Sequence, residues 1–171
     1  MQPNTRCMTS SVQLDRTKLF EEMEKQFDSS NEQYFKNLLT HDDGIVRTRA
    51  VCILADMAAE NAVAPIGDVL KHDKNALVRH EAAFSLGQLG FSSGIRALAD
   101  AVENDPSFFV RHEAAVALGV IGSEDARDIL EHALTRDESE EVRESAMVAL
   151  ANLDYIRAVN RTNKFTRMTG G

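Results

Sequence analysis

The chain has 171 residues and a formal net charge of −8, with 43% apolar residues and only 6% aromatic residues. This length suits a single domain with a sizeable core, and the acidic balance argues against a nucleic-acid-binding protein. No stretch approaches the roughly 18 consecutive apolar residues of a membrane span, so no membrane partner is expected. Few aromatic residues and few loop breakers favour closely packed helices over a β-sandwich.

The N-terminal segment, residues 1–12, is polar and lacks periodicity, so we expect it to be disordered. It also lacks the apolar core of a signal peptide, and a cytoplasmic location is the default. Residues 14–27 differ, because their apolar side chains recur at helical spacing. This pattern predicts a helix that caps the open end of a stack, with an apolar face formed by Leu19, Phe20, Met23 and Phe27.

Four valine–arginine pairs recur along the chain at steps of 32 residues (78 − 46 = 32). A fixed period of this size is typical of stacked helical hairpins, in which each pair opens the second helix. We therefore predict an all-α fold, an α-solenoid of four HEAT-like hairpins that forms one domain with its capping helix over residues 13–154. An aspartate four or five residues before each valine is expected to cap the second helix. The pairs are Val46-Arg47, Val78-Arg79, Val110-Arg111 and Val142-Arg143, and the aspartates are Asp42, Asp73, Asp105 and Asp137.

Two of the four second helices carry an added pair of polar residues directly after the arginine. The sequence Arg-His-Glu-Ala-Ala occurs at residues 79–83 and again at 111–115, whereas the other two units have Thr48-Arg49 and Glu144-Ser145 there. The repeat itself therefore does not require His-Glu. An ordinary surface role is the alternative, because glutamate early in a helix complements the helix dipole.

A metal site explains the paired His-Glu residues better than a surface role does. Equivalent residues on adjacent helices lie about 10 Å apart, and two histidines can reach one ion from that separation with bonds of about 2.0–2.1 Å. Imidazole with carboxylate suits iron, with manganese or zinc as further possibilities. We expect the metal ligands to be His80, Glu81, His112 and Glu113.

Other residues of the repeats are expected to have structural or surface roles. Gly87 and Gly119 lie inside helices, where glycine costs about 1 kcal/mol relative to alanine, so they indicate either tight helix packing or space beside each histidine. Cys52 lies in an apolar helix and is expected to be a small core residue; Cys7 and Cys52 form neither a disulfide framework nor a zinc motif. The remaining histidines are expected at the surface: His41, His72 and His132.

The 32-residue hairpin with Val-Arg, Ala-Ala, Leu-Gly and Ile-Gly resembles the HEAT-like repeat group named after phycobilin lyases, from Ser30 to about Asp154. The two Arg-His-Glu-Ala-Ala segments also resemble one half of deoxyhypusine hydroxylase, a HEAT-repeat di-iron monooxygenase. That family has two four-repeat halves, with His-Glu on the middle two repeats of each half. Here His-Glu lies on the middle two of four units, and the second half is absent.

The resemblance implies a non-haem di-iron, hydroxylase-like protein that uses dioxygen on an unknown substrate. Two copies facing each other about a two-fold axis would supply four His-Glu pairs, so a homodimer is expected. Each chain would supply His80 and His112 to one iron, while Glu81 or Glu113 reaches the other. The competing interpretation is a metal-free scaffold, or a chaperone-like or lyase-like module, that binds a protein or a tetrapyrrole through its concave face.

The C-terminal tail, residues 155–171, differs in charge from the rest of the chain. It carries four basic residues and no acidic ones, which leaves −12 on the remainder (−8 − 4 = −12). A solvated tail, a tail folded back on the acidic body and a docking segment for an anionic partner all fit this pattern. The basic residues are Arg157, Arg161, Lys164 and Arg167.

Overall fold

The protein is an array of α-helices without a strand in the part that the computed structural model describes, residues 5–159, with side chains from residue 15. The α-helices are α1 (Thr5–Asp28), α2 (Glu32–Leu38), α3 (Gly44–Ala58), α4 (Val63–His72), α5 (Ala76–Leu89), α6 (Ile95–Asn104), α7 (Phe108–Ile121), α8 (Arg127–Arg136) and α9 (Glu140–Val159). Short 3₁₀ helices precede α4, α6 and α8, namely η1 (Ala59–Ala62), η2 (Ser92–Gly94) and η3 (Glu124–Ala126).

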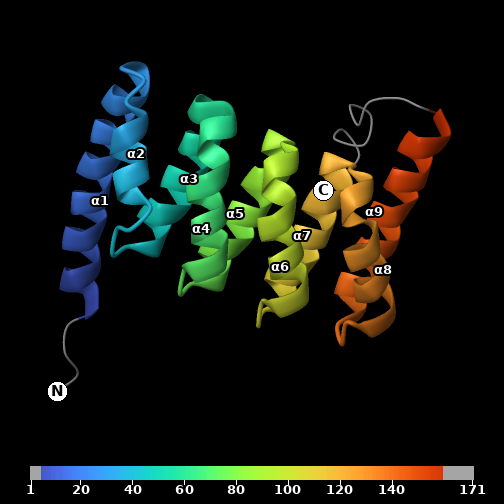
Figure 1. Ribbon diagram of the computed structural model, residues 1–171. Coiled ribbons are helices and arrows are strands. Elements are labelled where there is room, and N and C mark those ends of the chain that lie inside the picture. The colour runs from blue at the N-terminus through green and yellow to red at the C-terminus, as the bar shows by residue number, and fades with distance from the viewer. Residues whose placement is uncertain (1–4, 160–171) are drawn as a thin grey trace.

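The helices form two rows (Figure 1). One row consists of α2, α4, α6 and α8, and the other of α3, α5, α7 and α9. Each first helix packs on its own second helix, and within the first row α4 packs on α6 and α6 on α8. Helix α1 packs against α2 and α3 at one end. The predicted α-solenoid of four hairpins with an N-terminal capping helix is therefore confirmed.

The capping helix begins earlier than the sequence pattern indicated. Helix α1 starts at Thr5, within the segment of residues 1–12 that was expected to be disordered. Residues 5–12 contain neither glycine nor proline, and extending an existing helix adds one hydrogen bond for each residue that is fixed. Residues 1–4, and residues 160–171 of the basic tail, lie outside the described part; residues 155–159 of that tail complete α9.

The core lies between the two rows and repeats with the sequence. Matching leucines of the second helices and matching apolar residues of the first helices are all 0–1% exposed. Burying each such side chain contributes about 1.5–3 kcal/mol. The two sets are Leu54, Leu86 and Leu118, and Ile66, Leu98 and Leu130.

Buried ion pairs join each unit to the next. The arginine of each valine–arginine pair donates two hydrogen bonds to an aspartate in the following turn, with Nε–Oδ2 distances of 2.6, 2.7 and 2.8 Å. A third bond, from Nη1, reaches a backbone carbonyl of the arginine's own turn. We call these pairs the arginine–aspartate ladder: Arg47–Asp73, Arg79–Asp105 and Arg111–Asp137.

The ladder corrects the expected role of the turn aspartates. The side chains that cap α3 and α5 belong to Asp43 and Asn75, each of which accepts a bond from the backbone N–H two residues later. Asp73 is instead held by Arg47 and by the N–H of Asn75. The side chain of an aspartate at the start of the turn faces the preceding unit, so it binds the arginine there rather than the first N–H groups of the helix that follows.

The two mid-helix glycines serve tight packing. A Cβ atom on Gly87 would lie 2.8 Å from the Cβ of Ala117, and one on Gly119 would lie 2.8 Å from both Cα and Cβ of Ala149. Neighbouring second helices therefore approach too closely for any side chain at these positions. The alternative, that the glycines leave space beside the histidines, is not what the structure shows.

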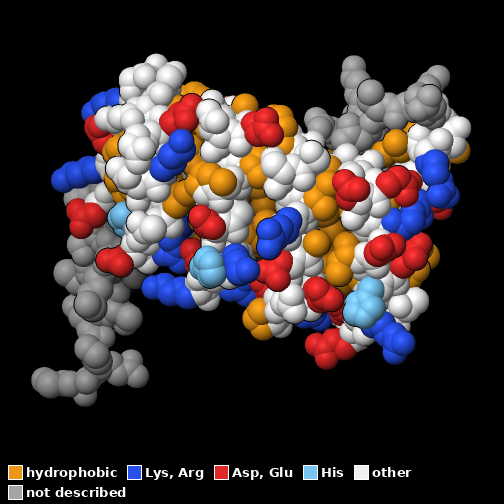
Figure 2. Space-filling model, viewed as in Figure 1, with side chains coloured by type: hydrophobic (Ala, Val, Ile, Leu, Met, Phe, Trp, Pro, Cys, Tyr) orange, Lys and Arg blue, Asp and Glu red, His pale blue; other side chains and the backbone are white. Residues whose placement is uncertain are grey.

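One described stretch, Gly44–His72, is long and apolar enough to cross a membrane by length and composition alone. It consists of α3 and α4 joined through η1, with Ala59 at φ 47° between them. The stretch folds as two helices of the stack, and its buried apolar residues, among them Val51, Leu54 and Ile66, belong to the core. The face formed by α2, α4, α6 and α8 mixes acidic, basic and apolar side chains without a patch of one sign (Figure 2).

Candidate functional site

The predicted ligands lie along the row of second helices, near the start of α5 and α7. His80 and Glu81 follow the buried Val78-Arg79 pair of α5, and His112 and Glu113 occupy the same places in α7. Their side chains are only partly buried, since they sit beside rather than on the core-facing stripe. We call these four residues and their partners Cys52 and Ser145 the His-Glu row.

One contact in the row joins predicted ligands of two units. His80 Nε2 lies 3.2 Å from Glu113 Oε2, with the two side chains 20% and 12% exposed. The imidazole stacks on Phe109 of α7, with centroids 3.9 Å apart and planes at 8°. Its other nitrogen, Nδ1, is buried and has no hydrogen-bond partner among the described residues. His80 is therefore held by the next helix on its face and at its Nε2 edge.

The His80–Glu113 distance fits two ligands of one cation. Two donor atoms at right angles on bonds of about 2.1 Å lie about 3.0 Å apart, and tetrahedral ligands lie slightly farther apart. The observed 3.2 Å falls between these values. A hydrogen bond from imidazole to carboxylate has the same length, so the pair can persist without metal.

His112 has a different partner. Its Nδ1 lies 2.6 Å from the hydroxyl oxygen of Ser145 in α9, and that hydroxyl donates to the backbone carbonyl of Glu141 at 2.6 Å. A serine hydroxyl has one proton, so the bond to the carbonyl makes His112 Nδ1 the donor. The neutral ring then carries its free electron pair on Nε2, as metal-binding histidines do when the other nitrogen is anchored.

Glu81 contacts a residue that sequence reasoning placed in the core. Its Oε1 accepts a hydrogen bond from the Cys52 thiol at 3.0 Å, and Cys52 is exposed. Local burial, followed by the bond to Glu81 and its negative charge, raises the pKa of the thiol to about 12. The thiol is therefore protonated at neutral pH. Cys52 is a hydrogen-bond donor on the row rather than a core residue.

The four predicted ligands do not converge on one point. Among the described side chains, residues 15–159, no group of three or more His, Cys, Asp or Glu residues is placed to hold a metal ion. The structure brings His80 to Glu113 and His112 to Ser145, both 33 residues apart. Within one chain the row thus offers two adjacent donor atoms, from His80 and Glu113, with His112 and Glu81 next to them in the row. The role of these four residues as metal ligands stays a prediction.

Sequence reasoning missed Ser145 and Phe109 as neighbours of the histidines. Their signal was present, because each lies one unit downstream, at 33 residues from His112 and 29 from His80. The other histidines lie away from the row: His72 and His132 are exposed, and half-buried His41 accepts a bond from the Asp43 N–H.

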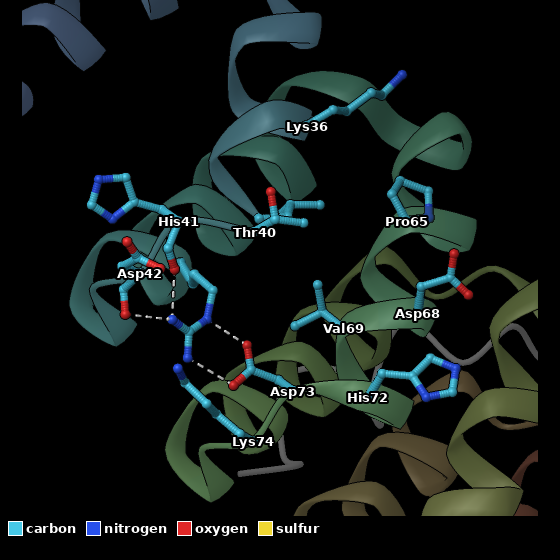
Figure 3. A pocket seen from close by; sticks show the side chains of 12 residues that line it. Lys36, Thr40, His41, Asp42, Pro65, Asp68, Val69, His72, Asp73 and Lys74 are labelled. Atoms are coloured by element: carbon cyan, nitrogen blue, oxygen red, sulfur yellow. Dashed lines mark hydrogen bonds and ion pairs between the residues drawn. The ribbon is translucent and has the colours of Figure 1, made fainter.

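Two of the hollows in the described surface can be compared with the position of the predicted ligands. A groove of about 680 Å³ lies between α2 and α4, with Lys36 and Thr40 on one side and Asp68 and His72 on the other (Figure 3). It is on the opposite row from the predicted ligands. A cleft of about 470 Å³ between α1 and α3 is closer to them, because Cys52 lines it and contacts Glu81. Its walls include Phe20, Met23, Phe27 and Arg49.

A family model for HEAT repeats matches residues 63–151, just over half of the chain. The chain belongs to the HEAT-repeat family. Among solved structures, this HEAT-repeat protein is similar to human deoxyhypusine hydroxylase in complex with glycerol, with a TM-score of 0.69 and 27% sequence identity. The match covers 81% of this chain and 48% of that one, so the chain spans about half the length of that enzyme. A search of curated proteins found no match.

Proposed function

We propose that this HEAT-repeat protein is a non-haem iron protein of the hydroxylase type, with a di-iron centre shared between two copies of the chain. The observation that carries the proposal is the contact of His80 with Glu113 across neighbouring units, at a distance suited to ligands of one ion. The similarity to human deoxyhypusine hydroxylase supports a hydroxylase-like activity. The native metal is proposed as iron, with manganese or zinc as the next fits to imidazole and carboxylate.

The proposed dimer follows from the incompleteness of the row. One chain offers His80 and Glu113 as an edge, and no third donor is placed with them among the described residues. A second copy that faces the row about a two-fold axis would supply the same donors again. Glu81 of each chain would reach across after leaving Cys52.

The residues of the row would divide the work. His112 presents Nε2 because Ser145 holds its Nδ1 proton, and His80 and Glu113 would bind through the atoms that now face each other. Bound iron would supply the reduction of dioxygen. The cleft beside Cys52, which apolar and charged side chains line together, is a candidate space for an organic substrate. Cytoplasmic location is part of the same proposal.

The test measures metal content and oligomeric mass on one sample. The chain is reconstituted anaerobically with ferrous iron, desalted, and analysed by elemental analysis and analytical ultracentrifugation. We expect a dimer with about one iron per chain, as shared His and carboxylate ligands imply. His80→Ala/His112→Ala should lose the iron, while the control His72→Ala/His132→Ala, with exposed histidines on the other row, should keep it. A metal-free monomer, or equal iron in both double variants, would refute the proposal.

Activity separates an enzyme from a carrier. Iron-loaded protein is supplied with oxygen, a reductant and candidate substrates, and product formation is followed by mass spectrometry. Turnover that requires both oxygen and the histidines supports the hydroxylase. Reversible binding of oxygen without product assigns a carrier.

A metal-free binding module is the second candidate, and the exposed apolar side chains of the second helices favour it. Leu77 is 55% exposed, and Phe84 and Phe109 are each 40% exposed near the His-Glu row. Such side chains suit contact with a protein or a flat tetrapyrrole. Two results would favour this function. Protein purified without chelator would contain no bound metal, and Phe84→Ala would weaken the binding of a protein or tetrapyrrole ligand.

A further inference from the structure

Each interior second helix presents the same set of positions to the next unit. In α7, Arg111 reaches Asp137, Ala115 is fully buried, and Gly119 meets Ala149 of α9. In α5 the matching residues are used in the same way, since Arg79 reaches Asp105 and Gly87 meets Ala117. A unit boundary therefore consists of one ion pair beside a stripe of small buried residues.

Helix α9 has the same positions, but no further unit packs on them within the described residues. Met147 is 55% exposed, whereas the matching residues Val51, Ala83 and Ala115 are 0% exposed. Ala151, which matches Gly87 and Gly119, is exposed as well, and so is Glu144 at the place of the histidines. We call Arg143, Glu144, Met147 and Ala151 the C-terminal end face. Alanine is compatible with packing here, because Ala55 holds the matching place in α3 beside α5.

Arg143 is the most informative residue of this face. Its Nη1 donates to the carbonyls of Asp137 and Glu138 at 2.8 and 3.1 Å, as the other ladder arginines do in their own turns. In those arginines Nε and Nη2 bind the next aspartate. In Arg143 the same two nitrogens make no hydrogen bond or ion pair with the described side chains, residues 15–159, or with the described backbone. A planar fork of this kind fits a carboxylate through two parallel bonds.

The other end of the stack is closed. Arg16 of α1 donates two bonds to Asp43, at 2.9 and 2.7 Å, and Met23 of α1 is only 1% exposed against the first hairpin. The two ends therefore differ, because α1 covers one and no described residue covers the other. This asymmetry is independent of any metal at the His-Glu row.

We propose that the C-terminal end face is a docking site for a HEAT-type helical hairpin on another polypeptide, with an aspartate in its turn. The aspartate would bind Nε and Nη2 of Arg143, and the second helix of that hairpin would cover Met147 and Ala151. A second copy of this chain lacks a suitable hairpin. Its ladder aspartates already bind arginines, its first unit has His41 at the matching place (73 − 32 = 41), and α1 covers that unit.

The test uses a designed HEAT-repeat protein as the probe, built without an N-terminal capping helix and with aspartate in its first turn. Its binding to the full chain is measured by fluorescence anisotropy. We expect saturable binding that weakens at least tenfold for Arg143→Gln and for Met147→Glu. The control Arg136→Gln changes an exposed arginine of α8 that makes no ion pair within the described residues, and it should bind as the unchanged chain does.

A matched probe decides whether the fork is the recognition element. Replacing the turn aspartate of the probe by asparagine should weaken binding as much as Arg143→Gln does, and combining the two changes should add little. Equal binding of both probes would overturn the proposal. It would also be overturned by self-association of the chain that Met147→Glu abolishes, which assigns the face to a second copy. Tenfold tighter binding after deletion of residues 160–171 would overturn it too, because the chain's own C-terminal segment would then be the occupant.

Discussion

The two His-Glu pairs have the same local sequence and different surroundings. His112 is anchored through Nδ1 by Ser145, which leaves Nε2 available. His80 contacts Glu113 through Nε2, and its buried Nδ1 has no hydrogen-bond partner in the described part of the chain. The difference arises one unit downstream, where α7 offers glutamate and α9 offers serine. In a stacked repeat, the chemistry of a side chain thus depends on the next repeat as much as on its own motif.

The arginine–aspartate ladder should stabilise the units of His80 and His112 to nearly the same extent. Asp105→Asn and Asp137→Asn each remove the buried carboxylate partner of a buried arginine, which is expected to cost about 3 kcal/mol or more of unfolding free energy. In Asp137→Asn, Arg111 then keeps only the exposed carboxylate of Glu138, at 3.5 Å. The two losses, measured by urea denaturation, should agree within about 1 kcal/mol, given the similar burial of the two pairs. A loss in only one variant would show that the units are not equivalent even in their scaffold.

The Arg111–Asp137 pair predicts how the free energy of unfolding changes at acid pH. Burial raises the pKa of Asp137, but hydrogen bonds from Arg111 and the Ser139 N–H, with the charge of Arg111, outweigh it and leave the pKa below the usual value. A lowered folded pKa stabilises the protein above the unfolded value, near 3.9, and this contribution is lost as pH falls through the folded pKa. Stability of the unchanged chain should therefore fall more steeply below pH 4 than that of Asp137→Asn.

Glycine replacement should separate packing from helix propensity. In Gly119→Ala the new Cβ meets the Ala149 backbone at 2.8 Å, so we expect a net loss of about 1–2 kcal/mol despite the better helix propensity of alanine. Gly87→Ala should cause a similar loss, because its new Cβ would clash with Ala117. The control is Gly67→Ala in α4, whose nearest contact is 3.4 Å from Ala97 Cβ. This change should be neutral or stabilising by up to about 1 kcal/mol in thermal unfolding.

Removing the anchor of His112 should make the two histidines more alike. Ser145→Ala leaves Nδ1 without its acceptor, and loss of such a partner typically lowers metal affinity by about 10–100-fold. Ferrous iron binding is measured by competition with a chelator, and Ser85→Ala, a buried serine of α5 outside the row, is the control. Unchanged affinity of Ser145→Ala would show that the anchor plays no part in metal binding.

The smallest effect concerns the two glutamates. Glu81 binds the Cys52 thiol, whereas Glu113 binds His80. In metal-free protein with Cys7 replaced by serine, Glu81→Gln should lower the raised pKa of Cys52 and speed its alkylation at pH 8 by about 2–5-fold. Glu113→Gln should leave the rate unchanged. Equal acceleration by both would mean that the net charge of the row, rather than the hydrogen bond, controls the thiol.

The sequence predicted the repeat but not the contacts between repeats. A period of 32 residues identifies equivalent positions, and these positions form the matching core and the matching glycine contacts. The contacts of the His-Glu row follow other spacings, 33 residues for His80–Glu113 and His112–Ser145 and 29 residues for Cys52–Glu81. These pairings are set by side-chain packing between helices, which the period alone does not contain.

Cys52 shows why an apolar helix is a weak guide to burial. Its matching residue in α5, Phe84, is apolar and 40% exposed. Much of a folded protein's surface is apolar, so the residue type at one position of a repeat does not fix its exposure. The exposure follows from the angle of that position to the neighbouring helix.

The ladder also gives the fold an unusual freedom of length. Each ion pair spans 26 residues and each unit 32. The arginine of every unit is therefore positioned to bind an aspartate in the turn of whichever unit follows it. If residues 91–122 were excised, Arg79 would be in register to bind Asp137, and His80 would acquire the hydroxyl of Ser145. A gene that loses or duplicates one such unit therefore encodes a joined stack at once, and the histidines change partners when the units do.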